Sequence, residues 1–327
     1  MIKKEMFLEI EKLGKKSIRE AFGDALVELG KKNKNVVALS ADLSESTRIN
    51  KFKERFPERY FECGVSEQNM IGVATGLALS GKIPFASSFG VFSPGLNLGQ
   101  IRLSVCYNNA NVKLLSTHCG ITTGQDGATH QALDDIAVAR SLPNMTVIVP
   151  SDYEEALKAV IAVSKIKGPC YIRVGRDKYT LFTTQKTPFE IGKANVLMEG
   201  SDCCIVACGI MVYEALIAAI ELQKSGIQCS VINCHTIKPI DKETIILWAR
   251  RTGAVVTAEE HSIIGGLGSA VAEVLSENFP VPVKRVGIKD TFGESGKPEE
   301  LMKKYGITKD NIINAVQAVL REKTKIL

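Results

Sequence analysis

Tryptophan and histidine are scarce in this chain of 327 residues, and long apolar runs are missing. There is one tryptophan, there are four histidines, and aromatic residues make up 6% of the sequence. The longest apolar runs have the length of strands, which argues against a transmembrane helix. The N-terminus also lacks the apolar core of a signal peptide. We therefore expect a cytoplasmic protein without a membrane partner.

A strong excess of charge of either sign is also missing. The 41 basic and 36 acidic residues leave a net charge of +5, and the two signs are interspersed. Nucleic-acid-binding chains usually concentrate basic residues in runs or patches, so we expect no nucleic-acid partner. Weak attraction of anionic substrates is compatible with this balance.

The nine cysteines do not form the even set of a disulfide framework, which in secreted proteins is usually carried by a short chain. They are scattered along the sequence, which favours free thiols in a reducing compartment. Cys203, Cys204 and Cys208 lie close enough in sequence to suggest a metal cluster. However, they belong to an apolar strand-like segment, where alternation sends Cys203 and Cys204 to opposite faces. We interpret these thiols as small buried hydrophobes.

The hydrophobic pattern alternates between helix and strand, which predicts α/β domains with mainly parallel sheets. A segment without periodicity at 180–190 predicts a linker, so we expect domains at 1–188 and 189–327. The expected helices are 18–30, 69–81, 133–140, 153–165, 211–225, 241–251 and 266–277. The expected strands are 36–39, 84–87, 112–116, 145–150, 170–174, 203–208, 229–233 and 254–258.

Polar and flexible residues are densest between Thr117 and Gln131. This stretch holds His118, Asp126, His130 and three glycines within fifteen positions. Glycine allows backbone to approach a ligand closely, and loops of this kind carry binding residues. A single histidine is most often structural, but two of four in one loop favour a polar ligand site.

Three further segments have both a structural and a functional interpretation. Glu67 precedes a helix of small and apolar residues, where the helix dipole alone would favour a carboxylate. Phe89 and Phe92 precede a turn at 93–95, and ordinary core packing would explain them. Asp42 follows an expected strand, where α/β proteins place ligand loops, although any polar turn also suits an aspartate.

Together these segments resemble the transketolases, which use thiamine diphosphate, and the resemblance runs from about Lys16 to the C-terminus. It implies a doubly wound, mainly parallel pyrimidine-binding domain of six strands, followed by a smaller α/β C-terminal domain. It also implies transfer of a two-carbon ketol unit from a ketose phosphate to an aldose phosphate.

The resemblance assigns cofactor contacts to five residues. Glu67 would hydrogen-bond a ring nitrogen of the aminopyrimidine and favour its imino tautomer, which takes the proton from the thiazolium carbon. A carboxyl group in an apolar pocket has a raised pKa and can share a proton. Phe89 and Phe92 would form walls of the aminopyrimidine pocket, with Phe92 stacked on the ring. Asp42 and Leu43 would lie against the middle of the cofactor.

The resemblance also assigns two groups of substrate contacts. Arg19, Ser46 and Arg176 match positions that bind substrate phosphate, and guanidinium groups pair well with phosphate oxygens. The opening loop residues His118, Asp126 and His130 match residues that hydrogen-bond sugar hydroxyls and the carbonyl region. Imidazoles with a pKa near neutrality can also shuttle protons, so both histidines join Glu67 as expected catalytic residues.

Some positions depart from the family pattern. Residues 96–100 replace an aromatic or arginine that is common there, and Gln125 replaces a glutamate, so their roles stay open. His235 and His261 are interpreted as structural or interfacial. The glycine-rich loop after His261 opens a helix and can bind anions, but it lacks a complete dinucleotide fingerprint.

The diphosphate-binding part of a transketolase is not found in this sequence. Full-length members carry Gly-Asp-Gly followed about thirty residues later by Asn, whereas Asp126-Gly127 here belongs to the histidine loop. Mg²⁺ requires hard oxygen ligands together with phosphate oxygens, so we expect its ligands on a partner. The expectation is the C-terminal subunit of a split transketolase, inactive alone. It would self-associate and form a heterotetramer with two N-terminal diphosphate-binding subunits.

Three alternatives remain open from the sequence. The first is the β subunit of the decarboxylating component of a 2-oxoacid dehydrogenase, which the expected phosphate contacts and the Asp126–His130 pair disfavour. The second is half of an enzyme resembling deoxyxylulose-phosphate synthase, whose substrates are also sugar phosphates. The third is a non-catalytic regulatory partner.

Overall fold

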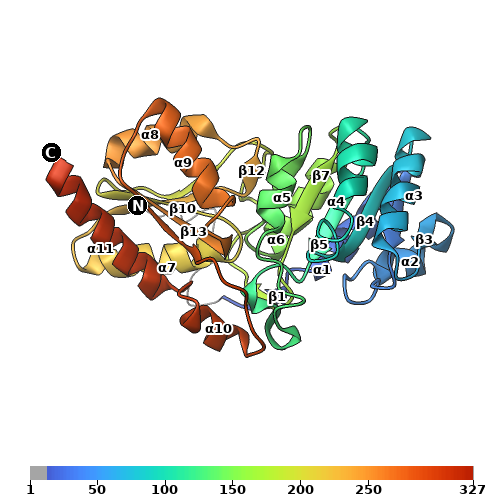
Figure 1. Ribbon diagram of the computed structural model, residues 1–327, viewed down its shortest axis with the longest axis horizontal. Coiled ribbons are helices and arrows are strands. Elements are labelled where there is room, and N and C mark those ends of the chain that lie inside the picture. Colours follow the sequence, from blue (N-terminus) through green and yellow to red (C-terminus); the bar gives the residue numbers. More distant parts are fainter. Residues whose placement is uncertain (1–12, 327) are drawn as a thin grey trace.

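The chain folds around two sheets that lie side by side, with a short two-stranded ribbon between them (Figure 1). The computed structural model describes residues 13–326. The first sheet has seven strands in the order β12-β6-β7-β5-β4-β2-β3, and the second has five in the order β14-β13-β10-β11-β9. This arrangement confirms the predicted α/β fold with mainly parallel sheets.

The first sheet is covered by helices on both faces, as a doubly wound fold requires. Side chains of β2 alternate, so that Val36 and Ala38 pack with one helical layer while Val37 and Leu39 pack with the other. The six strands from the first half of the chain are β2 Val36–Ser40, β3 Tyr60–Glu62, β4 Ile83–Phe89, β5 Lys113–Thr117, β6 Thr146–Ile148 and β7 Cys170–Arg173. One face carries α1 Glu20–Lys32 and α6 Tyr153–Val163, and the other carries α3 Glu67–Leu79, the π-helix η4 Ile101–Tyr107 and α5 Asp135–Ser141.

A seventh strand joins this sheet from the second half of the chain. β12, Thr236–Lys238, pairs antiparallel with β6. The six-stranded prediction is therefore incomplete, because a three-residue strand has no hydrophobic periodicity that sequence reasoning can detect. The strand ties the second half of the chain to the edge of the first sheet.

The second sheet also has helices on both faces. Its strands are β9 Asn195–Met198, β10 Cys203–Ala207, β11 Cys229–Asn233, β13 Val255–Ser262 and β14 Val283–Ile288. Helices α7 Met211–Lys224 and α11 Lys309–Ile326 share one apolar core, whereas α8 Lys242–Thr252 and α9 Leu267–Asn278 pack in the core between the sheets. All nine cysteines are free thiols and eight are buried, including Cys203 and Cys204, which confirms their interpretation as small hydrophobes. No described helix is long and apolar enough to cross a bilayer.

The segment proposed as a linker is fixed to the first domain. The carboxylate of Asp152 accepts hydrogen bonds from the backbone N–H groups of Phe182 and Thr183 at 3.0 and 2.7 Å. Lys158 donates to the carbonyl oxygens of Thr184 and Thr187 at 2.6 Å each. The boundary that we propose near residue 188 therefore follows a well-packed segment, which begins at the ribbon of β1 Lys15–Ser17 and β8 Lys178–Thr180.

Candidate active site

Several predicted site residues gather at the carboxyl ends of neighbouring parallel strands. Asp42 follows β2, Phe89 ends β4, and His118 directly follows β5, and these three strands are adjacent in the sheet. Ligands of open α/β sheets bind outside this edge. The structure therefore brings together residues that are far apart in the sequence.

Glu67 is the first residue of α3 and is 8% exposed. The hydroxyl of Ser88 donates to its Oε1 atom at 3.2 Å, and the amide of Asn97 donates to its backbone oxygen at 3.4 Å. The helix N-terminus favours the carboxylate, while burial leaves it few partners. Sequence reasoning missed Ser88 and Asn97, although alternation along the strand 83–89 could have indicated Ser88.

An aromatic cluster forms beside these strand ends. The rings of Phe89 and Phe92 stack with centroids 5.7 Å apart, and the imidazole of His118 stacks on Phe89 at 3.7 Å. The His130 ring approaches both phenylalanines edge-on, at 6.1 and 5.6 Å. The cluster joins two residues expected to touch the cofactor with two expected to touch the substrate.

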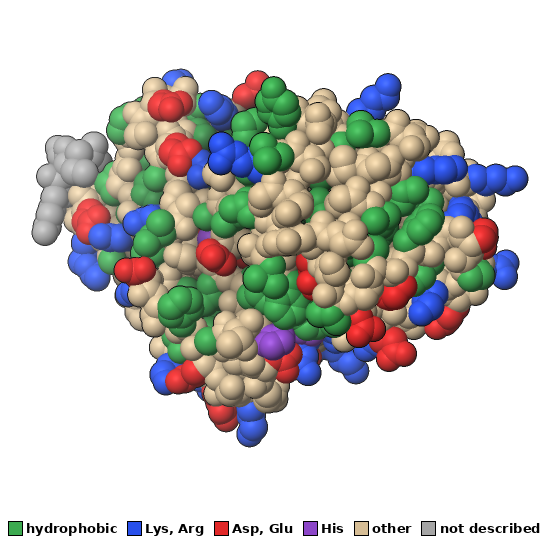
Figure 2. Space-filling view, turned by 45° about the vertical axis from the view of Figure 1, so that its right-hand side comes forward, with side chains coloured by type: hydrophobic (Ala, Val, Ile, Leu, Met, Phe, Trp, Pro, Cys, Tyr) green, Lys and Arg blue, Asp and Glu red, His purple; other side chains and the backbone are tan. Residues whose placement is uncertain are grey.

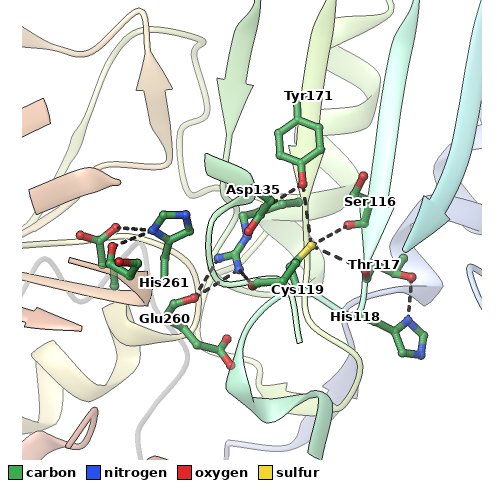
Figure 3. A network of polar contacts seen from close by, with 12 residues as sticks. Ser116, Thr117, His118, Cys119, Asp135, Tyr171, Glu260 and His261 are labelled. Carbon is green, nitrogen blue, oxygen red and sulfur yellow. Dashed lines mark hydrogen bonds and ion pairs between the residues drawn. The ribbon is translucent and has the colours of Figure 1, made fainter. Parts of the chain in front are cut away.

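His118 is buried, and Figure 3 shows its ring in contact with the Thr117 hydroxyl. Burial, together with the positive charges of Arg19 and Arg176, lowers its pKa to about 3. Its Nδ1 atom lies 2.8 Å from the Thr117 hydroxyl. The pKa of His118 is therefore not near neutrality as expected, and its catalytic role stays a prediction. The ring can donate or accept one hydrogen bond as a neutral imidazole.

The two predicted arginines lie close to His118 and to each other. Burial, followed by the charges of Arg48 and Arg176, lowers the pKa of Arg19. The ribbon explains this proximity, because β1 ends two residues before Arg19 and β8 begins two residues after Arg176. The pairing of the two strands therefore places both guanidinium groups at one end of the site.

The contacts of the arginines differ in part from the expected phosphate clamp. Arg19 donates to the backbone oxygen of Ser46 at 2.6 Å, so the bond uses the main chain of Ser46 and not its hydroxyl. Arg176 forms an ion pair with Asp126 at 3.1 Å and donates to the Thr123 oxygen at the same distance. The residues expected to bind phosphate and those expected to bind the sugar thus lie together. In part they bind one another, since Arg176 pairs with Asp126.

The loop after β2 is held at the exposed edge of the site. Asp42 has a left-handed backbone with φ of 60°, and its N–H donates to Oε1 of Glu62 at 2.7 Å. The Leu43 N–H donates to the Ser40 hydroxyl at 3.0 Å. Glu62 also accepts from Tyr60 at 2.6 Å, so this carboxylate fixes the loop that carries both expected cofactor contacts.

The remaining histidines have structural surroundings. His235 is buried and stacks on Phe189 at 4.3 Å, and burial lowers its pKa to about 4. His261 is buried beside Glu259, whose carboxylate accepts from the N–H groups of Leu267 and Gly268 at 2.7 and 2.8 Å. The anion at the start of this glycine-rich helix is therefore the protein's own glutamate.

The site suits an aromatic heterocycle better than a metal ion. A buried carboxylate with a hydroxyl partner lies on the same strand edge as a half-buried phenylalanine, a combination that can bind a ring nitrogen and a ring face. Among residues 13–326, no group of three His, Cys, Asp or Glu side chains is placed to hold a metal. Glu67, Phe89 and Phe92 are thus the residues that fit an aminopyrimidine ring.

Comparison with known proteins agrees with this geometry. Residues 14–180 match the model of the transketolase pyrimidine-binding domain, and residues 192–312 match that of the transketolase C-terminal domain. These two matches cover most of the chain and define an α/β protein with two transketolase domains, and the chain belongs to the transketolase family. It corresponds to the C-terminal subunit of a transketolase that is divided into two chains.

Three relatives illustrate this correspondence. A putative transketolase C-terminal section from Methanocaldococcus jannaschii is 46% identical, over 94% of this chain and 97% of the relative. A 6-deoxy-6-sulfo-D-fructose transketolase subunit from a Clostridium species is 44% identical, over 95% and 97%. The solved structure of a split-gene transketolase, described as an inactive beta4 tetramer, is 51% identical with a TM-score of 0.89, over 94% of this chain and 99% of that one.

Proposed function

We propose that this subunit binds the aminopyrimidine side of thiamine diphosphate and the sugar substrate, and transfers a two-carbon ketol unit between sugar phosphates together with a diphosphate-binding subunit. The observation that carries the proposal is the position of Glu67 beside Ser88, on the strand edge that also holds Phe89 and the paired arginines. When bound, the cofactor would supply the carbon nucleophile for the ketose carbonyl. The subunit's own residues bind and orient.

Glu67 would hold a proton shared with a ring nitrogen of the cofactor. The Ser88 hydroxyl at 3.2 Å and the α3 N-terminus fix the carboxyl group in position. A carboxyl group with little access to water exchanges a proton with a nearby nitrogen more readily than one that is fully hydrated. Phe92 would cover the face of the ring, supported from behind by Phe89.

His118, His130 and Asp126 would orient the hydroxyl groups of the sugar. His118 is neutral, so it selects a hydroxyl as a hydrogen-bond partner without adding charge. Its stacking on Phe89 links the orientation of the imidazole to the aromatic wall of the cofactor pocket. The substrate carbonyl and the cofactor ring would thus be aligned by one cluster.

Arg19 and Arg176 would bind the terminal oxyanion of the substrate. Two neighbouring guanidinium groups attract an anion strongly, and burial together with nearby positive charges, that of Arg176 among them, lowers the pKa of Arg19. An incoming phosphate would compete with Asp126 for Arg176, which releases this carboxylate toward a sugar hydroxyl. The name of the Clostridium relative refers to a sulfo sugar, and a sulfonate is also a tetrahedral oxyanion that such a pair can hold.

The partner subunit would cover an apolar face of the first domain and supply the ligands of Mg²⁺. We define this face, the α3 face, by its exposed large hydrophobic side chains: Val65, Leu79, Leu96, Leu98, Leu103 and Tyr107. Figure 2 shows hydrophobic side chains, together with uncharged polar side chains and backbone, over the middle of one side of the molecule, with charged side chains mostly toward its margins. An apolar patch of this kind marks an interaction site, here for the partner and for self-association into a heterotetramer.

The test is ketol transfer from xylulose 5-phosphate to ribose 5-phosphate in the presence of thiamine diphosphate and Mg²⁺. We expect no transfer by this chain alone and transfer when the diphosphate-binding subunit is added. Full activity of the isolated chain would contradict the subunit hypothesis. Release of CO₂ from pyruvate by the mixture, without ketol transfer, would favour the synthase-like or the 2-oxoacid dehydrogenase alternative.

A further inference from the structure

A buried carboxylate of the C-terminal domain contacts the substrate loop of the first domain. Glu260 lies on β13 and is 4% exposed, and its Oε1 atom accepts a hydrogen bond from the Thr122 N–H at 2.7 Å. Thr122 belongs to the short helix η5 Ile121–Asp126, which lies between His118 and His130. Figure 3 shows Glu260 reaching from the second sheet toward the segment that carries His118.

The neighbouring glutamate on the same strand points elsewhere. Glu259 caps α9 within its own domain through the N–H groups of Leu267 and Gly268. Adjacent residues of a strand face opposite sides, so one glutamate serves the C-terminal domain and the other serves the site. This divergence supplies a matched pair of buried carboxylates for experiments.

Thr122 connects Glu260 to the ribbon that carries the two arginines. Its hydroxyl lies 2.6 Å from the hydroxyl of Tyr179, which is half-buried on β8 of the ribbon. Tyr179 pairs with Lys16 on β1, three residues before Arg19, and lies three residues after Arg176. A chain of two hydrogen bonds therefore runs from the C-terminal domain to the element that positions both guanidinium groups.

The surroundings leave Glu260 little freedom. Gly120 has φ of +92°, and a Cβ atom there would lie 2.2 Å from the carboxyl carbon of Glu260, so only glycine leaves room for this side chain. Arg173 donates to the backbone oxygen of Glu260 at 3.2 Å and pairs with Asp135 at 2.7 Å. The backbone and the carboxyl group of Glu260 are thus both fixed, and burial raises the pKa of this group to about 7.

A small cavity is lined by the residues that directly precede the two arginines in the sequence. Its volume is about 10 Å³, enough for about one water molecule. Glu260 and Arg173 line it together with Ile18 and Gly175, the residues that precede Arg19 and Arg176. A second hydrogen bond joins the loop to the C-terminal domain, since Gln131 donates to the backbone oxygen of Glu294 at 2.9 Å. The C-terminal domain therefore forms the floor of the oxyanion end of the site.

We propose that Glu260 is a positioning residue of the substrate site, through which the C-terminal domain fixes the 117–131 loop and the Arg19–Arg176 pair and so sets the preference for phosphorylated sugars. The preference for phosphate rests on the function proposed above, whereas the fixing of the loop does not. The two parts are therefore tested by separate measurements.

The first measurement is backbone hydrogen exchange in this chain alone, with E260A, E260Q and the control E259A. In E260A we expect exchange in peptides covering 117–131 to accelerate about tenfold, as expected for the loss of one buried hydrogen bond. E260Q retains an acceptor for the Thr122 N–H and should restore protection. E259A should accelerate exchange at 267–270 and leave the loop unchanged. Should E260A fail to fold, E260D can replace it. Its side chain is shorter by one methylene group, so the carboxylate lies farther from the Thr122 N–H, and the same local change is expected.

The second measurement uses the complete two-chain enzyme and compares xylulose 5-phosphate with xylulose as donor. In E260A the ratio of kcat/KM between the phosphorylated and the plain sugar should fall about tenfold, chiefly through KM, and E260Q should restore it. Wild-type protection of the loop in E260A, or an unchanged donor ratio, would overturn the proposal. Altered exchange without ketol transfer in any variant, wild type included, would reject the proposed function and retain the positioning role.

Discussion

The two domains differ in what they leave exposed. Six of the nine large hydrophobic side chains that are exposed in residues 13–326 lie on the α3 face of the first domain, and three are spread over the C-terminal domain. Tyr107 is 84% exposed and Val65 is 81% exposed. The first domain therefore presents one concentrated apolar surface, whereas the C-terminal domain has no comparable concentration among its described residues.

Buried carboxylates of both domains bind backbone N–H groups, as Asp152 does in the first domain, and Glu67 is the exception. In the C-terminal domain, Glu259 and Glu260 are buried and bind backbone N–H groups of the protein itself. In the first domain, Glu67 has a single side-chain hydrogen bond of 3.2 Å at the edge of the α3 face. The sparse hydrogen bonding of Glu67 supports the proposal that a partner subunit completes its site.

The largest expected effect tests Glu67, in the part of the site that the first domain supplies. Glu67→Gln removes the proton that the carboxyl group would share with the cofactor but keeps its size and its bond to Ser88. We expect ketol transfer by the two-chain enzyme to fall at least about 100-fold, the lower range for loss of a general acid–base group. Steady-state kinetics with xylulose 5-phosphate measures this loss.

The control for this prediction is the fold and assembly of the variant. Thermal unfolding and partner binding of E67Q should match the wild type, because the substitution preserves the volume at a helix start. Unchanged activity in a correctly assembled E67Q enzyme would show that Glu67 has no catalytic role and would favour the regulatory alternative.

An intermediate effect tests the exposed surface. Leu103→Glu places a charge on the α3 face, where the side chain is 63% exposed. We expect the affinity for the diphosphate-binding subunit to fall about 30-fold, since a truncated or charged interface centre typically costs about 2 kcal/mol. Titration calorimetry or light scattering can measure it.

Leu247→Glu is the matched control, because Leu247 is 47% exposed on α8 of the C-terminal domain. It should leave partner affinity within about twofold of wild type, as expected for a surface substitution outside the interface. Equal losses in both variants would remove the distinction between the two domains that the exposed residues suggest.

The sequence predicted the elements with long hydrophobic patterns and missed those held by pairing alone. Helices such as α6 and α7 were found within a few residues, because an amphipathic pattern persists over several turns. Strands β1, β8 and β12 have three residues each and depend on partners that are distant in the sequence. Their absence from the prediction hid the ribbon that brings Arg19 to Arg176.

The site was predicted to the extent that its residues belong to recognisable segments. Glu67, Phe89, Phe92 and His118 gather as expected, whereas the pKa of His118 was misjudged, because burial and nearby arginines are properties of the folded chain. Glu260 stands 138 positions from Thr122 in sequence. No local pattern connects them, so their contact could be found only in three dimensions.

The smallest expected effect concerns the pH dependence of stability and tests Glu260, the buried carboxylate of the C-terminal domain. Burial raises the pKa of Glu260 from an ordinary 4.5 to about 7, so between these values the folded chain holds a proton that the unfolded chain has released. Stability from this group is therefore greatest at the acid end of the window and falls as pH rises through 7. Glu260→Gln cannot titrate, so relative to wild type it should gain about 2 kcal/mol in unfolding free energy between pH 5 and pH 8.

Urea unfolding of both proteins across this range measures the difference, and other titrating groups cancel in the comparison because they are common to both. Glu155, which is also buried with a pKa raised to about 7, remains in the variant, so part of the pH dependence must persist. A difference between the two proteins that is constant with pH would mean that Glu260 keeps the same charge throughout. Its hydrogen bond to Thr122 would then be permanently charge-assisted.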